Sequence, residues 1–209
     1  MALHATAQFF SNGTRSVMLW KHLQVTPLKY YFAGLFISFG VFCMITFMPD
    51  KILVFTLLGL APFIPQMLRG RVKFDFTRPL HAFVCGLMVA CLHFTAGVSG
   101  PLLNIFFQDI AMTRHEVVAT KALSQAVSHV LKFVYFSFIA GSMEAASSVP
   151  LWLYAAIVPV AIFGNHLASF ILDRMTDKGF YRITQRVLWG LGALYLGRAL
   201  WMYLMQHPA

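Results

Sequence analysis

Apolar runs long enough to cross a membrane dominate this chain and restrict the folds open to it. A helix needs about 20 mainly apolar residues to span the hydrocarbon core of a bilayer. With 59% hydrophobic and 11% charged residues, the chain could not hide its apolar surface in one soluble core. We therefore predict an all-α, polytopic integral membrane protein of the cell membrane, most simply the bacterial inner membrane. The predicted spans are 28–48, 51–68, 117–140, 149–172 and 187–206.

Two further segments are less regular. Segment 3–19 is a marginal sixth span, because polar residues interrupt it. Segment 79–107 is long, and its middle, residues 96–101, reads A-G-V-S-G-P, which a continuous helix would not favour. We expect this segment to be broken there.

The charged residues predict a topology. Lysine and arginine concentrate in connections that we expect to be cytoplasmic, since short cytoplasmic loops carry an excess of these residues; the net charge of +9 therefore does not indicate nucleic-acid binding. If every other segment crosses the membrane once, these connections fall on the cytoplasmic side only when segment 79–107 enters and leaves on that side. We therefore predict that segment 79–107 is a re-entrant hairpin. The cytoplasmic connections are 20–27, 69–78 and 173–186, and the outer ones are 49–50 and 141–148.

Segment 117–140 carries a polar, cationic stripe. At 100° per residue its members fall on one helix face, and lysines inside an apolar helix must face protein, water or a ligand. We interpret the stripe as part of an anion pathway; the alternative, open for Lys121, is a side chain that reaches the headgroups. The stripe consists of Lys121, Ser124, Gln125, Ser128, His129 and Lys132.

The stripe occurs twice. His4, Gln8, Ser11, Asn12 and Arg15 have the spacings of Lys121, Gln125, Ser128, His129 and Lys132, and both segments read A-x-x-Q-x-x-S-x-x-x-[R/K]. We predict one transporter domain over 1–209, with a first half at 1–68, a connection at 69–78 and a second half at 79–209. One hairpin makes the two halves opposite in orientation, which is the inverted-repeat arrangement of many secondary transporters.

The predicted hairpin has its own chemistry. Pro101 suits the first turn of a half-helix that continues through Asn104. The turn from Gly97 to Gly100 would leave backbone N–H groups at the positive end of that helix, which is an anion site. The alternative is a packing helix kinked by glycine, with Ser99 hydrogen-bonded internally.

These residues resemble a known family. The broken segment followed by an Ala-Thr-bearing helix is similar to the TauE/SafE sulfite-exporter-like permeases, and the resemblance covers nearly the whole chain. It implies transport of small sulfur-containing or organic anions, such as sulfite or organosulfonates, without nucleotide hydrolysis. The family pattern has another Gly-rich segment before the first A-x-x-Q helix, so the first half is expected to be incomplete at its N-terminus. The resemblance points to Gly97, Ser99, Gly100, Pro101, Thr120 and Gln125.

The expected activity is transport by alternating access, with the coupling ion left open and the lipid bilayer as partner. We predict no enzyme activity, no cofactor and no metal, since the histidines lack ligand spacing. Two alternatives stay open: an anion channel with the same site, and a rhomboid-like protease with Ser99 as nucleophile and His166 as base. The predicted substrate contacts are Gly97, Ser99, Gly100, Pro101, Asn104, Thr120, Lys121, Gln125, Ser128, His129 and Lys132, with Gln8, Ser11, Asn12 and Arg15 from the first half.

Overall fold

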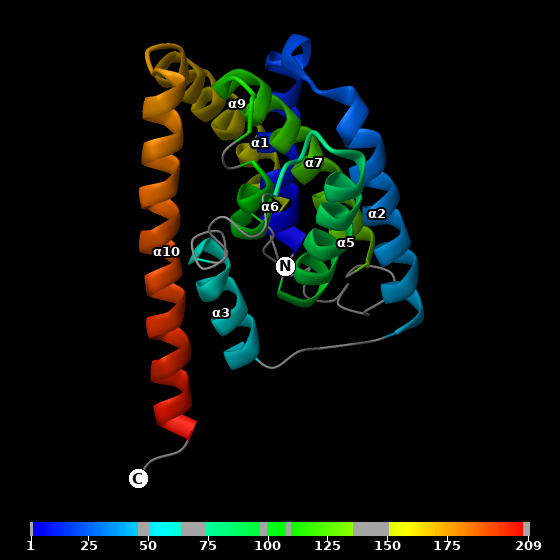
Figure 1. Ribbon diagram of the computed structural model, residues 1–209, viewed down its shortest axis with the longest axis vertical. Coiled ribbons are helices and arrows are strands. Elements are labelled where there is room, and N and C mark those ends of the chain that lie inside the picture. The colour runs from blue at the N-terminus through cyan, green and yellow to red at the C-terminus, as the bar shows by residue number, and fades with distance from the viewer. Residues whose placement is uncertain are drawn as a thin grey trace.

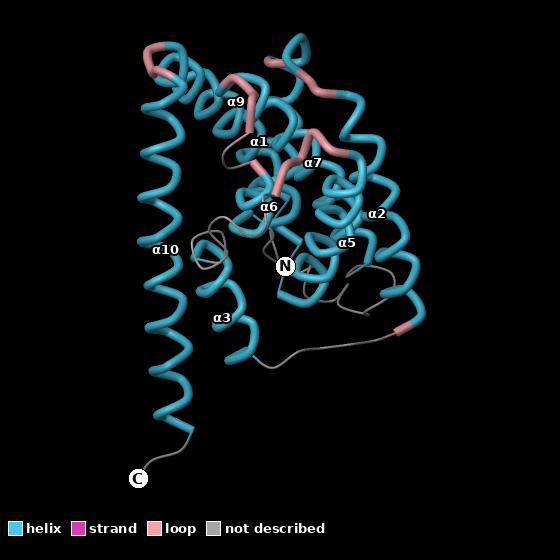
Figure 2. Tube along the Cα trace, in the orientation of Figure 1, coloured by secondary structure: helices cyan, strands magenta, loops and turns pink. Residues whose placement is uncertain are grey.

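The computed structural model describes residues 2–45, 51–63, 74–96, 100–107, 110–135 and 151–206. Over these ranges the chain forms helices and no strands, so the predicted all-α class is confirmed for them (Figure 1, Figure 2). The elements are α1 (Ala2–Met18), η1 (Trp20–His22), α2 (Val25–Met44), α3 (Lys51–Leu60), η2 (Ala61–Phe63), α5 (Pro79–Ala96), α6 (Gly100–Phe106), α7 (Arg114–Val134), α9 (Leu151–Asp173) and α10 (Asp177–Gln206).

Within the described residues, three helices are long and apolar enough to cross a membrane, judged by length and composition. They cover Val25–Met44, Ala155–Asp173 and Asp177–Gln206. Large apolar side chains stay exposed on them: Phe163 is 72% exposed and Leu194 is 70% exposed. Soluble monomers rarely expose continuous apolar surface of this kind, whereas lipid would cover it.

The two copies of the repeated motif pack against each other in opposite directions. Ala5, near the start of α1, lines a pocket with Phe133, near the end of α7. Arg15, near the end of α1, lines another pocket with Val118, near the start of α7. The helices α1 and α7 are therefore antiparallel.

Other helices also pack across the predicted boundary between the halves. Helix α2 packs against α5 and α7, α9 packs against α1, and α3 packs against α10. In Figure 1, α10 runs along one edge of the molecule beside α3, and α2 lies beside α5 at the other edge.

The long segment is broken where the sequence predicted. Helix α5 ends at Ala96 and α6 begins at Gly100; residues 97–99 lie outside the described residues. The chain then returns to its starting point, because the backbone N–H of Phe76 donates to the carbonyl of Phe106 at 3.0 Å. The rings of Phe76 and Phe107 stack with centroids 4.3 Å apart. Helices α5 and α6 thus form a hairpin that begins and ends in the same place.

The prediction that residues 173–186 form a connection is wrong for most of that range. Helix α10 begins at Asp177 and continues for 30 residues, so only residues 174–176 link it to α9. The charges had suggested a loop, but lysine and arginine are good helix formers. Asp177 in the first turn also complements the positive end of the helix.

Glycines let α2 and α5 touch through their backbones. A Cβ atom on Gly34 would collide with the carbonyl oxygen of Phe83, and one on Gly86 would collide with the carbonyl oxygen of Tyr31. Because the two glycines face each other's helix, the crossing is closer than any side chain would allow. This crossing joins the hairpin to the rest of the fold.

We predict that Gly34→Ala destabilises the protein by about 1–3 kcal/mol, the usual cost of forcing extra atoms into a packed interior. Gly40 lies in the same helix and has nothing within 4 Å of an added Cβ. Gly40→Ala should therefore be neutral or slightly stabilising, because alanine favours the helix. Thermal unfolding of both variants in detergent checks this; equal melting temperatures would contradict the close crossing.

Candidate functional site

The N-terminus of α7 is fixed by a capping box. The hydroxyl of Thr113 accepts from the backbone N–H of Glu116 at 3.3 Å, and the Glu116 carboxylate accepts from the backbone N–H of Thr113 at 2.8 Å. Glu116 also accepts from the side-chain amide of Gln24. The backbone N–H of Gln24 donates to the hydroxyl of Thr120 at 3.2 Å. Thr120, predicted as a substrate contact, therefore holds the start of α2.

The hairpin meets the cationic face of α7 at four predicted residues. The ammonium of Lys121 donates to the side-chain oxygen of Asn104. A Cβ atom on Gly100 would lie 3.5 Å from the side-chain nitrogen of Gln125. Gly100 and Asn104 are one turn apart on α6, as Lys121 and Gln125 are on α7. The structure thus brings these four residues together along two helix turns.

The α1 copy of the stripe binds α9 instead. The Arg15 guanidinium donates to the side-chain oxygen of Asn165 from Nε at 3.2 Å and from Nη2 at 2.9 Å. The Asn165 amide in turn donates to the carbonyl of Ser11 at 2.6 Å. Beside them, Asn12 donates to the side-chain oxygen of Gln8 at 3.2 Å. Asn165 is 2% exposed and was not predicted; a polar residue inside an apolar run was the signal for it.

The remaining stripe residues turn toward α2 and α5. The Ser128 hydroxyl lies 3.1 Å from the hydroxyl of Tyr31 on α2. The ring of His129 lies against that of His93 on α5, with centroids 4.6 Å apart. Lys132 is buried, with 1% of its surface exposed. The predicted stripe is thus divided between the hairpin on one side and α2 with α5 on the other.

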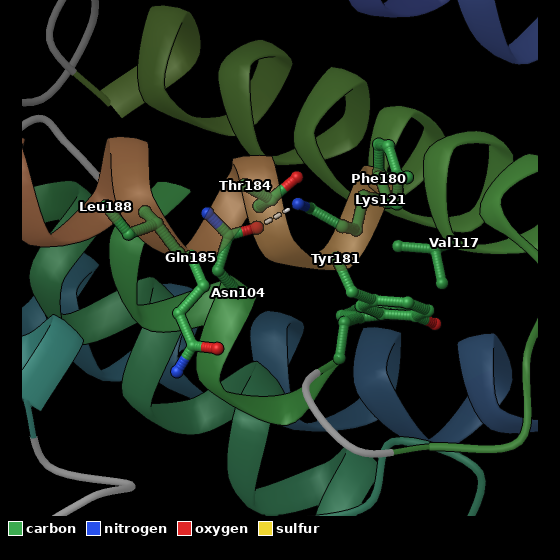
Figure 3. Close-up of a pocket in the computed structure, with 9 residues that line it drawn as sticks. Asn104, Val117, Lys121, Phe180, Tyr181, Thr184, Gln185 and Leu188 are labelled. Atoms are coloured by element: carbon green, nitrogen blue, oxygen red, sulfur yellow. Dashed lines mark hydrogen bonds between the residues drawn. The ribbon is translucent and has the colours of Figure 1, made fainter. Parts of the chain in front are cut away.

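Two neighbouring pockets each contain one of the cations. The first, of about 50 Å³, lies between α6, α7 and the start of α10 and contains Lys121 (Figure 3). The second, of about 260 Å³, lies between α1, α7, α9 and α10 and contains Arg15. Phe180 lines both pockets, and no carboxylate is among the described residues that line either one. The polar residues of the first pocket are Asn104, Lys121, Tyr181, Thr184 and Gln185.

Some predicted residues are not placed. Gly97 and Ser99 lie outside the described residues, and Pro101 is described only by its backbone, in α6. The anion site expected from the backbone of that turn therefore also lies outside them. His166 is exposed on α9, whereas its neighbour Asn165 is buried. The Ser99–His166 pair stays a prediction.

Comparison with protein-family models, with curated proteins and with solved structures gives no match for this chain. The functional argument therefore depends on the polar side chains described above. Among the described residues, no group of three or more histidine, cysteine, aspartate and glutamate side chains could hold a metal ion. What the geometry offers is a set of fixed cations and hydrogen-bond donors.

The cap of α7 should respond to pH. Hydrogen bonds hold the pKa of Glu116 below its usual value, first the one from the backbone of Thr113, then those from the side chains of Thr113 and Gln24. A depressed carboxyl pKa stabilises the fold above the unfolded-state value and loses that contribution as pH falls through the folded-state value. The effect on stability should be about 0.3–1 kcal/mol, as for a surface charge at a helix N-terminus.

Glu116→Gln keeps the capping geometry but not the charge. The variant should therefore melt below the unmodified chain at pH 7, and the two should converge as the pH is lowered through about 4. Melting curves in detergent between pH 3 and pH 8 measure this. A gap that is constant across the range would show that the charge contributes nothing.

Proposed function

We propose that this chain is a multi-pass membrane permease for small anions, sulfur-containing oxyanions or organosulfonates, working by alternating access. The observation that carries the proposal is how Arg15 and Lys121 are held. Each donates to the amide oxygen of an asparagine, Asn165 or Asn104, and each lines a pocket to which the described residues contribute no carboxylate. The amides fix the two side chains but leave their charge for a ligand.

Cations elsewhere on the same helix are paired differently. At the start of α7, Arg114 forms an ion pair with Asp177 at 3.0 Å, and the ring nitrogen Nε2 of His115 lies 2.8 Å from a carboxylate oxygen of Asp173. The charge of Arg114 is therefore balanced locally, as expected for a structural end of a helix. Arg15 and Lys121 instead donate to amides, with no carboxylate partner among the described residues. In a medium of low dielectric, an unbalanced cation attracts anions strongly.

The arrangement of helices supports transport rather than simple binding. The antiparallel packing of α1 and α7 is what two oppositely oriented halves require, and the hairpin of α5 and α6 is the broken element expected at a site near the midplane. Phe180 lines both pockets. Rocking of one half against the other would shift the helices on either side of Phe180. An anion could then pass from the vicinity of one cation to the other.

The resemblance to the TauE/SafE permeases supports the same class of substrate. An anion channel would use the same residues and differs in that its flux does not saturate. A rhomboid-like protease has less support, because His166 is exposed while the polar side chains cluster around Arg15 and Lys121. Both alternatives are outcomes of the experiment that follows.

We expect saturable uptake of labelled sulfite or methanesulfonate into proteoliposomes containing the full chain. Asn165→Asp should lower this uptake at least tenfold, because a carboxylate of the same shape would neutralise Arg15 where the amide does not. Thr176→Asp is the matched control: it adds the same charge in the exposed turn between α9 and α10 and should leave uptake unchanged.

Gel filtration shows whether both variants are folded, since Asn165→Asp also loses the hydrogen bond to Ser11. Undiminished uptake by a folded Asn165→Asp variant would contradict the role of Arg15. Uptake proportional to concentration at all concentrations would indicate a channel. No uptake by the unmodified chain would overturn the proposed function.

A further inference from the structure

We infer that the pocket between α6, α7 and α10 is a binding site for a small monoanion, which it selects over dianions. This inference rests on the proposed function, because it names the class of anion that the permease would carry. It also assigns residues of α10 to the binding site. The polar ends of Asn104, Lys121 and Thr184 point toward one another in this pocket (Figure 3). None of the α10 residues was indicated by the repeated motif.

The described residues that line the pocket carry one charge. Among them Lys121 is the only cationic or anionic side chain, and the hydrogen bond to Asn104 leaves its charge in place. A monoanion would bring the pocket to neutrality. A dianion would leave one negative charge unbalanced in a buried place, which is costly.

The neutral groups of the pocket are mainly hydrogen-bond donors for such a ligand. The oxygen of the Asn104 amide accepts from Lys121, so the nitrogen of that amide is the atom that can donate to an anion. Thr184 adds a hydroxyl from α10, whereas the amide of Gln185, which also lines the pocket, points away from Lys121 and Asn104 (Figure 3). The hydroxyl of Tyr181 already donates to the carbonyl of Met112 at 2.9 Å, so it positions α10.

The size and the walls of the pocket further restrict which ligands can bind there. Its volume is about 50 Å³, and a single water needs about 10–15 Å³, so it accommodates several waters or one small oxyanion. Phe107, Val117 and Leu188 form apolar walls beside the polar groups. An anion with one charged end and a small apolar part fits both surfaces.

Methanesulfonate and sulfate are the matched probes, because they share a tetrahedral sulfur and differ by one methyl group in place of one charged oxygen. We expect methanesulfonate to bind the purified full chain at least tenfold more tightly than sulfate in calorimetric titration. Asn104→Asp, which adds a balancing carboxylate beside Lys121 without changing the shape, should weaken methanesulfonate binding at least tenfold. Charge-assisted hydrogen bonds contribute on this scale.

Thr184→Val tests whether α10 contributes to anion binding. It should weaken methanesulfonate binding about threefold, as for the loss of one neutral hydrogen bond. Lys178→Met is the control: it removes an exposed cation two turns earlier on the same helix and should leave binding unchanged. The folded state of each variant is checked by its melting temperature in the absence of anion.

Equal or tighter binding of sulfate would overturn the inference, as would unchanged methanesulfonate binding in the folded Asn104→Asp variant. The experiments can contradict the binding site and the permease function independently of each other. Methanesulfonate binding that Asn104→Asp abolishes, without uptake into proteoliposomes, supports the site and rejects the permease. Uptake that Asn104→Asp and Thr184→Val leave unchanged supports the permease and rejects this site.

Discussion

Cationic side chains on two amphipathic helices, α1 and α7, impose the constraint on which the rest of this fold depends. Exposed to hydrocarbon, Arg15, Lys121 and Lys132 would each be costly, so their helices must face inward. The antiparallel packing of α1 and α7 meets this need, and the surrounding helices carry apolar residues to the outside. The hairpin and α9 then provide the amide oxygens that accept from Lys121 and Arg15. Burial of the charges and formation of the pockets are therefore consequences of the same packing.

Much of the fold could be predicted because membrane-length apolar runs and helix breakers are local signals. The run at 28–48 corresponds to α2, and the A-G-V-S-G-P sequence coincides with the gap between α5 and α6. The error at 173–186 came from treating charge as a loop signal. Long charged side chains can extend from one end of a helix into water, so Lys178 and Arg182 do not interrupt α10.

The candidate site was only partly predictable, because helical periodicity shows which residues share a face but not which helix covers that face. Gly100 lies near Gln125, in keeping with the prediction that the hairpin faces the stripe, whereas the contact of Lys121 with Asn104 was not predicted. Ser128 and Thr120 had the same periodicity but bind α2. Asn165, Thr184 and Gln185 belong to segments with no repeated motif, and only the packing of α9 and α10 brings them to the cations. Residues that join a site only through tertiary contacts cannot be identified from their spacing in the sequence.

The central claim is that a positive charge in the bundle is left unbalanced and open to anions. It is tested most directly by the reactivity of a cysteine placed at position 184, after replacement of Cys43, Cys85 and Cys91. An anionic thiosulfonate reagent should modify this cysteine at least tenfold faster than a cationic reagent of similar size, because the field of Lys121 raises the local concentration of anions. Added methanesulfonate should slow the reaction. A faster reaction with the cationic reagent, or equal rates for the two, would contradict the account.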